Sequence, residues 1–158
     1  MTNSFASHDH SHCVTDALQR AEAHCATHRL QLTPVRRRVL EILLKQHRAM
    51  GAYDILAVLD AEGLGSQPPV AYRALSFLVD HGFAHKVEQL NAYIACTHSE
   101  ASHTPVFLIC HGCGTVEEAK ADMQDAPLGR IAADTGFAIE HAVIEAQGLC
   151  PTCQQAQP

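Results

Sequence analysis

The sequence contains two Cys-x-x-Cys pairs, Cys110/Cys113 in ICHGCG and Cys150/Cys153 in LCPTC. Four thiolates in this arrangement suit one closed tetrahedral zinc site, because each pair supplies two sulfurs to one side of the metal. A zinc finger or ribbon leaves about 12 to 20 residues between its ligand pairs, whereas 36 residues separate Cys113 from Cys150. This gap is long enough for a strand, a helix and a second strand, so the metal would join two ends of a small domain.

Disulfide bonds in a secreted protein and a redox-active dithiol are the two other uses of such cysteines. The N-terminal segment MTNSFASHDHSHC has no apolar run that could serve as a signal peptide. The sequence also has no stretch of roughly 18 or more apolar residues that could span a membrane. We therefore expect a cytoplasmic protein with no membrane partner and with reduced cysteines. Two matched pairs also favour a metal over one catalytic dithiol.

Twelve histidines are many for a chain of 158 residues, and several lie near its N-terminus. The segment HDHSHC, residues 8–13, could bind a metal, but a short polar His-rich tail more often binds weakly or not at all. We expect residues 1–13 to form a disordered tail. Cys13 and Cys25 are assigned no role, because a small buried hydrophobe is the usual interpretation of a cysteine in a helix.

The first half of the chain has the periodicity of helices. Residues 14–30 have a helical composition with one loosely apolar face. Thr33-Pro34 is an N-cap followed by a proline at the first helical position. The apolar stripe of the helix that follows consists of Val35, Val39, Ile42 and Leu43. A third helix is predicted over residues 52–62, with Gly63 as its stop.

A fourth helix is predicted from Pro68-Pro69 to Gly82. Its periodic apolar positions leave Tyr72, Arg73 and Ser76 pointing outward. An exposed Tyr-Arg pair near a helix start is usually an ordinary surface. In the second helix of a helix-turn-helix, however, it would enter a major groove, where arginine can donate two hydrogen bonds to guanine.

Two short extended runs, residues 84–88 and 92–96, flank a turn that contains Asn91 and predict a hairpin directly after this helix. Helices followed by a hairpin make a winged helix. Antiparallel pairing would bring His85, at the start of the hairpin, close to Cys96 at its end. A lone histidine or cysteine on a strand is usually structural. A metal site becomes more persuasive because two more histidines, His98 and His103, follow within a few residues.

The second half predicts a small sheet. Residues 106–109 and 115–119 are strands joined by the first cysteine pair, and residues 125–135 are helical. Residues 137–146 alternate well enough for a long strand that leads to the second cysteine pair. One helix on three strands cannot bury both faces, and a domain of fewer than roughly 70 residues needs additional support. We expect zinc and a second copy of the chain to supply it.

Basic residues are concentrated in the first half of the chain. Residues 1–88 hold nine Lys and Arg and nine Asp and Glu, whereas residues 89–158 hold two and eight, and the formal net charge of the chain is −6. This asymmetry suggests two modules with different partners. A neutral first half lacks the broad positive field of a nonspecific DNA binder, so any DNA contact must come from a local patch.

From about Leu30 to Cys153 the sequence resembles the ferric uptake regulator family, and within it the zinc-responsive branch. The motifs that carry the resemblance are LTPVRRRVL, AYDIL, PPVAYRAL, LVDHGFAHKVE, ICHGCG and HAVIEAQGLCPTC. Members of the family are dimeric winged-helix repressors whose C-terminal halves form the dimer. The resemblance implies an α+β fold with an N-terminal winged-helix DNA-binding domain and a small C-terminal α/β dimerisation domain with a four-cysteine zinc site. The domains would be residues 14–96, with the wing at about 84–96, a hinge at 97–104 and residues 105–158.

The resemblance also implies the roles of individual residues. The four paired cysteines would hold structural zinc, and a sensory zinc site would consist of His85, Cys96, His103 and Glu118. One thiolate, two imidazoles and one carboxylate form a tetrahedral set that suits zinc, whereas an iron sensor would more usually avoid the soft sulfur. A further, weaker site, as in some relatives, would use His98, Glu117 and His141. The DNA-binding residues would be Tyr53, Tyr72 and Arg73.

The recognition helix departs from the family in one position. The family commonly has Thr-Val-Tyr-Arg, whereas this chain has Val70-Ala71-Tyr72-Arg73. The missing hydroxyl removes one hydrogen bond to a phosphate or base, so operator affinity or preference would differ.

The sequence therefore predicts a transcriptional regulator that is not an enzyme. We expect a homodimer that binds double-stranded operator DNA and represses zinc-uptake genes, with Zn(II), at least two per chain, as corepressor. An iron- or peroxide-sensing regulator of the same family is the alternative. A zinc deaminase needs a His-x-Glu and a Pro-Cys-x-x-Cys signature; His98-Ser99-Glu100 matches the first, but no proline precedes either cysteine pair. A zinc-binding interaction module without DNA is a third class.

Overall fold

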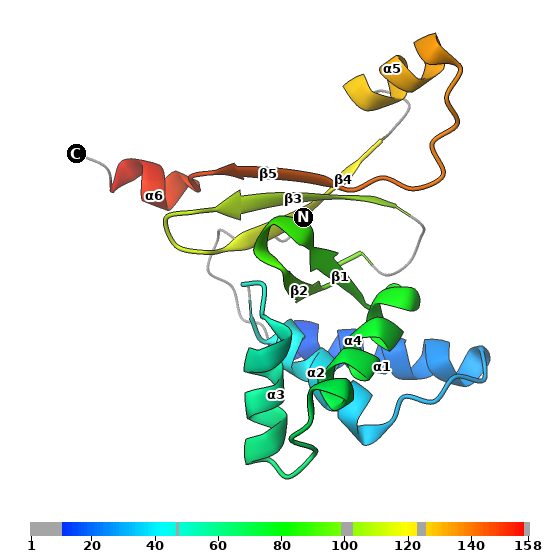
Figure 1. Cartoon of the computed structure of the whole chain (residues 1–158), viewed down its shortest axis with the longest axis vertical. Helices are drawn as coiled ribbons and strands as arrows, with labels where there is room; N and C mark the ends of the chain where they lie inside the picture. The colour runs from blue at the N-terminus through cyan, green and yellow to red at the C-terminus, as the bar shows by residue number, and fades with distance from the viewer. Residues whose placement is uncertain (1–10, 47, 99–102, 123–125, 157–158) are drawn as a thin grey trace. The chain divides into compact units, whose positions relative to one another are not determined.

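The computed structural model describes residues 11–46, 48–98, 103–122 and 126–156. The chain forms two compact units, Met1–Cys96 (unit 1) and Thr97–Pro158 (unit 2). Unit 1 contains α1 (Ser11–Thr27), α2 (Pro34–Leu44), α3 (Ala52–Ala61), α4 (Pro68–Asp80), β1 (Ala84–Val87), the 3-10 helix η1 (Glu88–Leu90) and β2 (Ala92–Ala95) (Figure 1). Unit 2 contains β3 (Thr104–Cys110), β4 (Val116–Ala121), α5 (Pro127–Thr135), β5 (Ile144–Gly148) and α6 (Pro151–Gln155).

The helices of unit 1 begin and end at the residues that their chemistry favours. Thr33 caps α2, since its hydroxyl oxygen accepts a hydrogen bond from the N–H of Arg36 at 3.4 Å. Pro68 lies at the first position of α4, where no N–H is needed. After α4 the chain turns at Gly82 with a φ of +74°, a backbone conformation in which a side chain would be strained. The first ten residues of the predicted tail lie outside the described residues, and α1 begins at Ser11.

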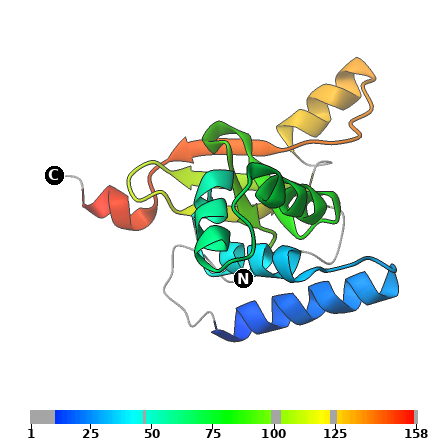
Figure 2. The same cartoon turned by 60° about the horizontal axis from the view of Figure 1, so that its bottom comes forward.

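One hydrophobic core holds the four helices of unit 1 together. α1 packs along α2 (Figure 2), and α4 contacts both α2 and α3. The predicted inner faces are confirmed: every helix contributes buried side chains to this core, among them Leu18, Cys25, Val39, Leu43, Ile55, Leu59, Leu75 and Leu78. The burial of these side chains fixes α4, and with it the outward direction of the α4 residues that were predicted to face DNA.

Ion pairs add links between these helices at the surface. Arg37 of α2 lies 2.8 Å from the carboxylate of Glu22 on α1. Arg38 of α2 lies 2.6 Å from Glu62, which directly follows α3, and its Nε also donates to that carboxylate at 2.7 Å. Such exposed pairs contribute only about 0 to 1 kcal/mol each. Their main effect is that two of the three consecutive arginines in α2 already have carboxylate partners.

The predicted hairpin follows α4. β1 and β2 pair antiparallel, with Ala84 opposite Ala95 and His85 opposite Ile94. The short connection is η1 followed by Asn91, which adopts the left-handed conformation with a φ of +45°, as asparagine does more readily than most residues. Ala84 and Ala95 pack against the helical core. Because side chains alternate along a strand, the neighbouring residue His85 lies on the opposite face of the hairpin.

Unit 2 is built on a three-stranded sheet with the order β4-β3-β5. β3 pairs antiparallel with β4 and parallel with β5. One face of the β3–β4 ribbon is buried and contains Phe107, Ile109 and Val116. α5 ends at Gly136, whose φ of +69° is the usual end of a helix. The helix predicted over residues 125–135 is therefore confirmed for its described residues.

The long strand predicted over residues 137–146 is wrong for most of its length. β5 starts only at Ile144, which lies opposite Val106 of β3, and ends at Gly148. In the same register Val143 would lie opposite Pro105, and a proline has no N–H to donate to the ladder. Alternation in the sequence therefore overestimated the strand. The short helix α6, which contains Cys153, was not predicted.

Within the described ranges, no helix combines the length and the apolar composition needed to cross a bilayer.

We expect the core of unit 1 to depend on Leu75. This side chain is fully buried, so Leu75→Ala should lower the free energy of unfolding of unit 1 by about 2 to 5 kcal/mol. Ser76→Ala, at the exposed neighbouring position on the same helix, should change it by less than about 0.5 kcal/mol. Urea denaturation followed by circular dichroism measures both. Equal effects of the two variants would contradict the assignment of the helix faces.

Candidate metal centres and nucleic-acid interface

The two Cys-x-x-Cys pairs lie together in unit 2. The sulfurs of Cys110, Cys113, Cys150 and Cys153 all lie within 4.8 Å of one another. The parallel register of β3 and β5 explains this arrangement, because Cys110 at the end of β3 lies opposite Gly148 at the end of β5. Each strand then leads into its own cysteine pair at the same edge of the sheet.

The backbone around the sulfurs is arranged to let them approach. The N–H of Cys150 donates to the sulfur of Cys110 at 3.3 Å. A Cβ atom at Gly112 would lie 3.0 Å from the sulfur of Cys153 and 3.1 Å from a methyl carbon of Leu149. The glycine between the first two cysteines therefore leaves room for the second pair. Four thiols with these contacts fit a tetrahedral zinc ion.

Hydrogen bonds change the acidity of three of the thiols in this cluster. Backbone N–H groups, above all those of Cys150 and Cys113, lower the pKa of Cys110 to about 6. Hydrogen bonds with Thr115 lower the pKa of Cys113. The neighbouring thiols, first Cys150 and then Cys110, raise the pKa of Cys153 to about 12. The cluster thus favours some thiolates but resists full ionisation, which is the electrostatic condition that a bound cation removes.

Two of the predicted sensory ligands, His85 and Cys96, belong to the hairpin of unit 1. The N–H of Cys96 donates to the carbonyl of Phe83 at 2.9 Å, which continues the antiparallel register beyond β2. His85 and Cys96 are therefore diagonal neighbours on one face of the hairpin. Cys96 is buried and His85 is partly exposed. The structure confirms the predicted proximity of these two residues.

The other two predicted sensory ligands, His103 and Glu118, belong to unit 2. His103 directly precedes β3 and Glu118 lies on β4, and His103 Nε2 is 2.8 Å from Glu118 Oε1. The second carboxylate oxygen of Glu118 accepts two hydrogen bonds from Thr97, one from the N–H at 2.8 Å and one from the hydroxyl at 3.0 Å. Glu118 is only 4% exposed. Among the residues that the structure describes, it is the only charged residue that is buried. An imidazole and a carboxylate so close together could supply two ligands to one metal.

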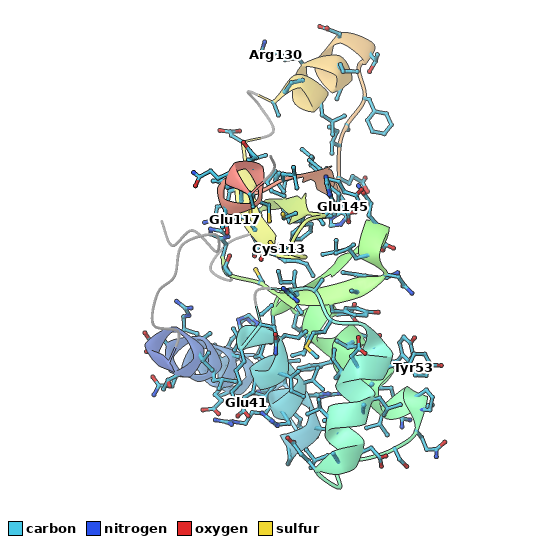
Figure 3. All side chains as sticks on the ribbon, turned by 90° about the vertical axis from the view of Figure 1, so that its left-hand side faces the viewer. Glu41, Tyr53, Cys113, Glu117, Arg130 and Glu145 are labelled. Carbon is cyan, nitrogen blue, oxygen red and sulfur yellow. The ribbon has the colours of Figure 1, made fainter. Side chains whose placement is uncertain are left out.

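The three residues of the predicted weaker site take different positions in unit 2. His98 Nδ1 lies 3.8 Å from Glu118 Oε1. Glu117 (labelled in Figure 3) pairs with Leu108, and because successive side chains of a strand alternate, it lies on the other face of β4 from Glu118. His141 is exposed in the segment before β5. The role of this set as a metal site stays a prediction.

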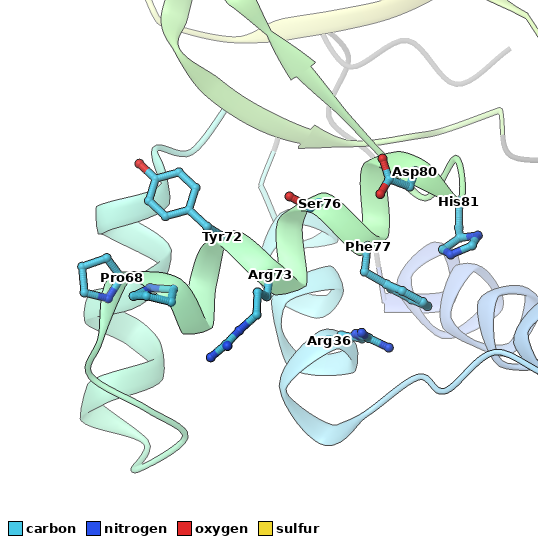
Figure 4. A pocket seen from close by; sticks show the side chains of 9 residues that line it. Arg36, Pro68, Tyr72, Arg73, Ser76, Phe77, Asp80 and His81 are labelled. Carbon is cyan, nitrogen blue, oxygen red and sulfur yellow. The ribbon is translucent and has the colours of Figure 1, made fainter.

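The predicted DNA-binding residues lie on the surface of unit 1. Tyr72 is 43% exposed on α4, and Tyr53 is 67% exposed on α3 and projects away from the helix (Figure 3). Tyr72 and Arg73 line an open groove of about 630 Å³ along α4, whose other residues are Arg36, Pro68, Pro69, Ser76, Phe77, Asp80 and His81 (Figure 4). An exposed helix face with an aromatic side chain and an arginine can contact base edges and phosphates.

Sequence reasoning missed Arg36 as a residue of this groove. Its guanidinium lies 3.9 Å from the centre of the Phe77 ring, and its Nη1 donates to the carbonyl of Gln31 at 2.6 Å. These two contacts hold Arg36 beneath α4, on the side where Arg73 also extends (Figure 4). The sequence signal was the run Arg36-Arg37-Arg38, in which only the structure shows that the last two residues have carboxylate partners.

Comparison with known proteins gives the family. Residues 27–147 match the sequence profile of the ferric uptake regulator family. The chain belongs to the ferric uptake regulator family. The family profile thus spans α2 to α4, the hairpin and the first cysteine pair, and it ends within β5, before the second pair.

Individual members of the family are similar over most of their length. The zinc uptake regulation protein of Escherichia coli (strain K12) is 41% identical over 143 residues, which cover 90% of this chain and 84% of that protein. A structure of a zinc uptake regulator complexed with zinc and DNA has a TM-score of 0.83 at 40% identity, over 90% of this chain and 96% of the other. The crystal structure of holo XcZur has a TM-score of 0.77 at 34% identity, over 87% of this chain and 96% of the other.

We expect Cys110 to be needed for the fold of unit 2 in this family member. Cys110→Ser should remove one zinc equivalent per chain and the cooperative unfolding of unit 2, because structural zinc contributes about 10 to 16 kcal/mol of apparent binding free energy to folding. Cys25→Ala, in the core of unit 1, is the matched control and should retain all bound zinc. Mass spectrometry under native conditions and thermal unfolding measure these effects. An unchanged zinc content in Cys110→Ser would contradict the assignment.

Proposed function

We propose that this protein is a zinc-responsive transcriptional regulator: a dimeric DNA-binding repressor of zinc-uptake genes with Zn(II) as corepressor. The observation that carries the proposal is the position of Cys96. This thiol ends the hairpin of unit 1 and is one peptide bond from Thr97, which hydrogen-bonds the buried carboxylate of Glu118 in unit 2. The peptide bond between Cys96 and Thr97 therefore connects the thiol of the hairpin to the part of unit 2 that contains His103 and Glu118.

The proposed sensory site consists of His85, Cys96, His103 and Glu118, which would coordinate one Zn(II) ion. Two of these ligands share one face of the hairpin, and the other two, His103 and Glu118, contact each other in unit 2. A thiolate among imidazole and carboxylate ligands favours zinc over iron(II), which is the physical argument against an iron sensor. The similarity to a regulator that was solved in complex with zinc supports the same metal.

The cysteine cluster would hold the second zinc of each chain, so at least two Zn(II) per chain are expected. It lies entirely in unit 2 and joins the ends of β3 and β5. Its proposed role is structural, because all four positions around the metal are protein ligands and none remains for a substrate. For the same reason we propose no enzymatic activity, as in a family of regulators.

The proposed partner is double-stranded operator DNA. The α4 groove presents Tyr72 and Arg73, and Tyr53 of α3 is exposed as well. Arg36 adds a positive charge to the same groove, held by Phe77 and the carbonyl of Gln31. Of the relatives, one was solved in complex with zinc and DNA at 40% identity to this chain.

Two copies of the chain would present two such helices. Unit 2 exposes large apolar side chains that a monomer would leave in water, namely Leu108, Leu128, Ile131, Phe137 and Val143. A dimer reads DNA only if its two recognition helices lie about one helical turn apart, roughly 34 to 36 Å, or a multiple of it. The ligands of the sensory site would favour the arrangement that meets this spacing, and DNA would then bind more tightly by the reciprocal coupling.

Substitution of Cys96 should distinguish the proposed sensory zinc site from the structural one. We expect Cys96→Ala to lose one zinc equivalent per chain and zinc-dependent DNA binding, while the protein remains a folded dimer. Zinc content, size-exclusion chromatography and fluorescence anisotropy with the native operator measure these properties. His111→Ala, a surface histidine outside both ligand sets, is the control. If iron(II) but not buffered zinc restored operator binding to the wild type, the iron-sensing alternative would replace this proposal.

The two arginines of the α4 groove should differ in their effect on DNA binding. Arg73→Ala should weaken operator binding by about 1 to 3 kcal/mol and relax the preference at one base pair, because arginine recognises guanine through two hydrogen bonds. Arg36→Ala should weaken binding equally for all sequences and reduce the salt dependence by about one phosphate contact. Titrations against operator variants at several salt concentrations measure both.

Arg20→Ala, on the exposed side of α1, controls for the loss of a positive charge and should bind as the wild type does. An unchanged footprint in Arg73→Ala, or no footprint in either protein, would favour a zinc-binding module that does not recognise DNA.

A further inference from the structure

The buried carboxylate of Glu118 has different partners on its two oxygens. Oε1 lies 2.8 Å from His103 Nε2. Oε2 accepts the N–H of Thr97 at 2.8 Å and the Thr97 hydroxyl at 3.0 Å. The side chain of Glu118 has no exposed surface, so these donors replace the water that an exposed carboxylate would bind. One oxygen is therefore occupied by Thr97, and the other faces the proposed metal ligand.

The hydroxyl of Thr97 also contacts the neighbouring histidine and selects the tautomer of its neutral ring. Thr97 Oγ1 lies 3.0 Å from His98 Nδ1. A hydroxyl has one proton to donate, and an ionised carboxylate can only accept. Since the proton of Thr97 goes to Glu118, the oxygen must accept a proton from His98 Nδ1–H. A neutral His98 in this arrangement carries its lone pair on Nε2.

We propose that Thr97 is a positioning residue of the zinc-sensing site, which holds Oε2 of Glu118 so that Oε1, beside His103, would be left as the ligand atom, and which fixes the tautomer of a neutral His98. This inference rests on the proposed function of Glu118 as a sensory ligand. It adds a residue that touches no metal itself: Thr97 acts through the orientation of the carboxylate. Hydrogen bonds to metal ligands commonly change metal affinity by 10- to 100-fold when they are removed.

The position of Thr97 in the chain strengthens this role. Thr97 directly follows Cys96, the proposed thiolate ligand, and its own N–H is one of the two donors to Glu118. The same pair of hydrogen bonds thus orients the carboxylate and holds the first residue of unit 2 against Glu118. A substitution that keeps the hydroxyl should preserve both effects, and one that removes it should retain only the N–H bond.

The test compares Thr97→Val, which removes the hydroxyl and keeps the shape, with Thr97→Ser, which retains the hydroxyl. Full-length protein with its structural zinc is titrated with a second zinc equivalent in competition with a chelator of known affinity. We expect Thr97→Val to bind this equivalent about tenfold more weakly, by analogy with other metal sites, and Thr97→Ser to bind within about threefold of the wild type. Thr135→Val removes a hydroxyl that bonds only to the carbonyls of Ile131 and Ala132 and should leave the affinity unchanged.

The cobalt(II) form distinguishes positioning from a merely structural role. Loss of one hydrogen bond to the buried carboxylate of Glu118 should lower the unfolding temperature of Thr97→Val without the second zinc, but its cobalt(II) form should retain the sulfur-to-metal absorption of Cys96, because the N–H donor of residue 97 remains. Equal affinities in wild type and Thr97→Val would overturn the proposal, as would a loss of affinity in Thr97→Ser equal to that in Thr97→Val. These measurements use no DNA, so they remain decisive even if the operator assay overturned the proposed function.

Discussion

The buried carboxylate of Glu118 is the constraint around which unit 2 is arranged. A carboxylate without water is costly unless hydrogen bonds or an opposite charge compensate it. Here the compensation comes from His103, immediately before β3, and from Thr97, the first residue of the unit. The antiparallel register of β3 and β4 places Glu118 opposite Phe107, and the imidazole of His103 reaches its carboxylate. The charge therefore ties the beginning of the unit to β4, an edge strand of its sheet.

The two proposed zinc sites use different physics for different tasks. The cysteine cluster is formed by residues at one edge of one sheet, with backbone N–H groups directed at the sulfurs and a glycine where a side chain would clash. Its ligands come from a single unit, so a bound metal would stabilise that unit and would not couple to unit 1. The proposed sensory ligands belong to two units that are joined by the peptide bond between Cys96 and Thr97. Zinc binding to these ligands can therefore bias a conformational equilibrium.

Much of the fold could be predicted from the sequence, because periodicity, caps and glycine stops act locally. The inner faces of the four helices of unit 1 and the hairpin at residues 84–96 followed from such signals. The extent of β5 did not, since it depends on which residue lies opposite Pro105, and register is a long-range property. The roles of Arg36 and Thr97 could not be predicted either. An arginine among three, or a threonine before a histidine, acquires its role only from the carboxylate or aromatic ring that the fold places beside it.

The adjacency of Cys96 and Thr97 also affects how the proposed sensor would respond to protein concentration. When two halves of a site are joined by a very short linker, closing the site is an intramolecular step with a high effective concentration of the second half. Zinc binding at such a site would be a property of a single polypeptide and would not depend on protein concentration. DNA binding by two copies would depend on protein concentration. At low protein concentration the zinc occupancy of each chain would therefore be unchanged, whereas the fraction of promoter bound would fall with the number of regulator molecules.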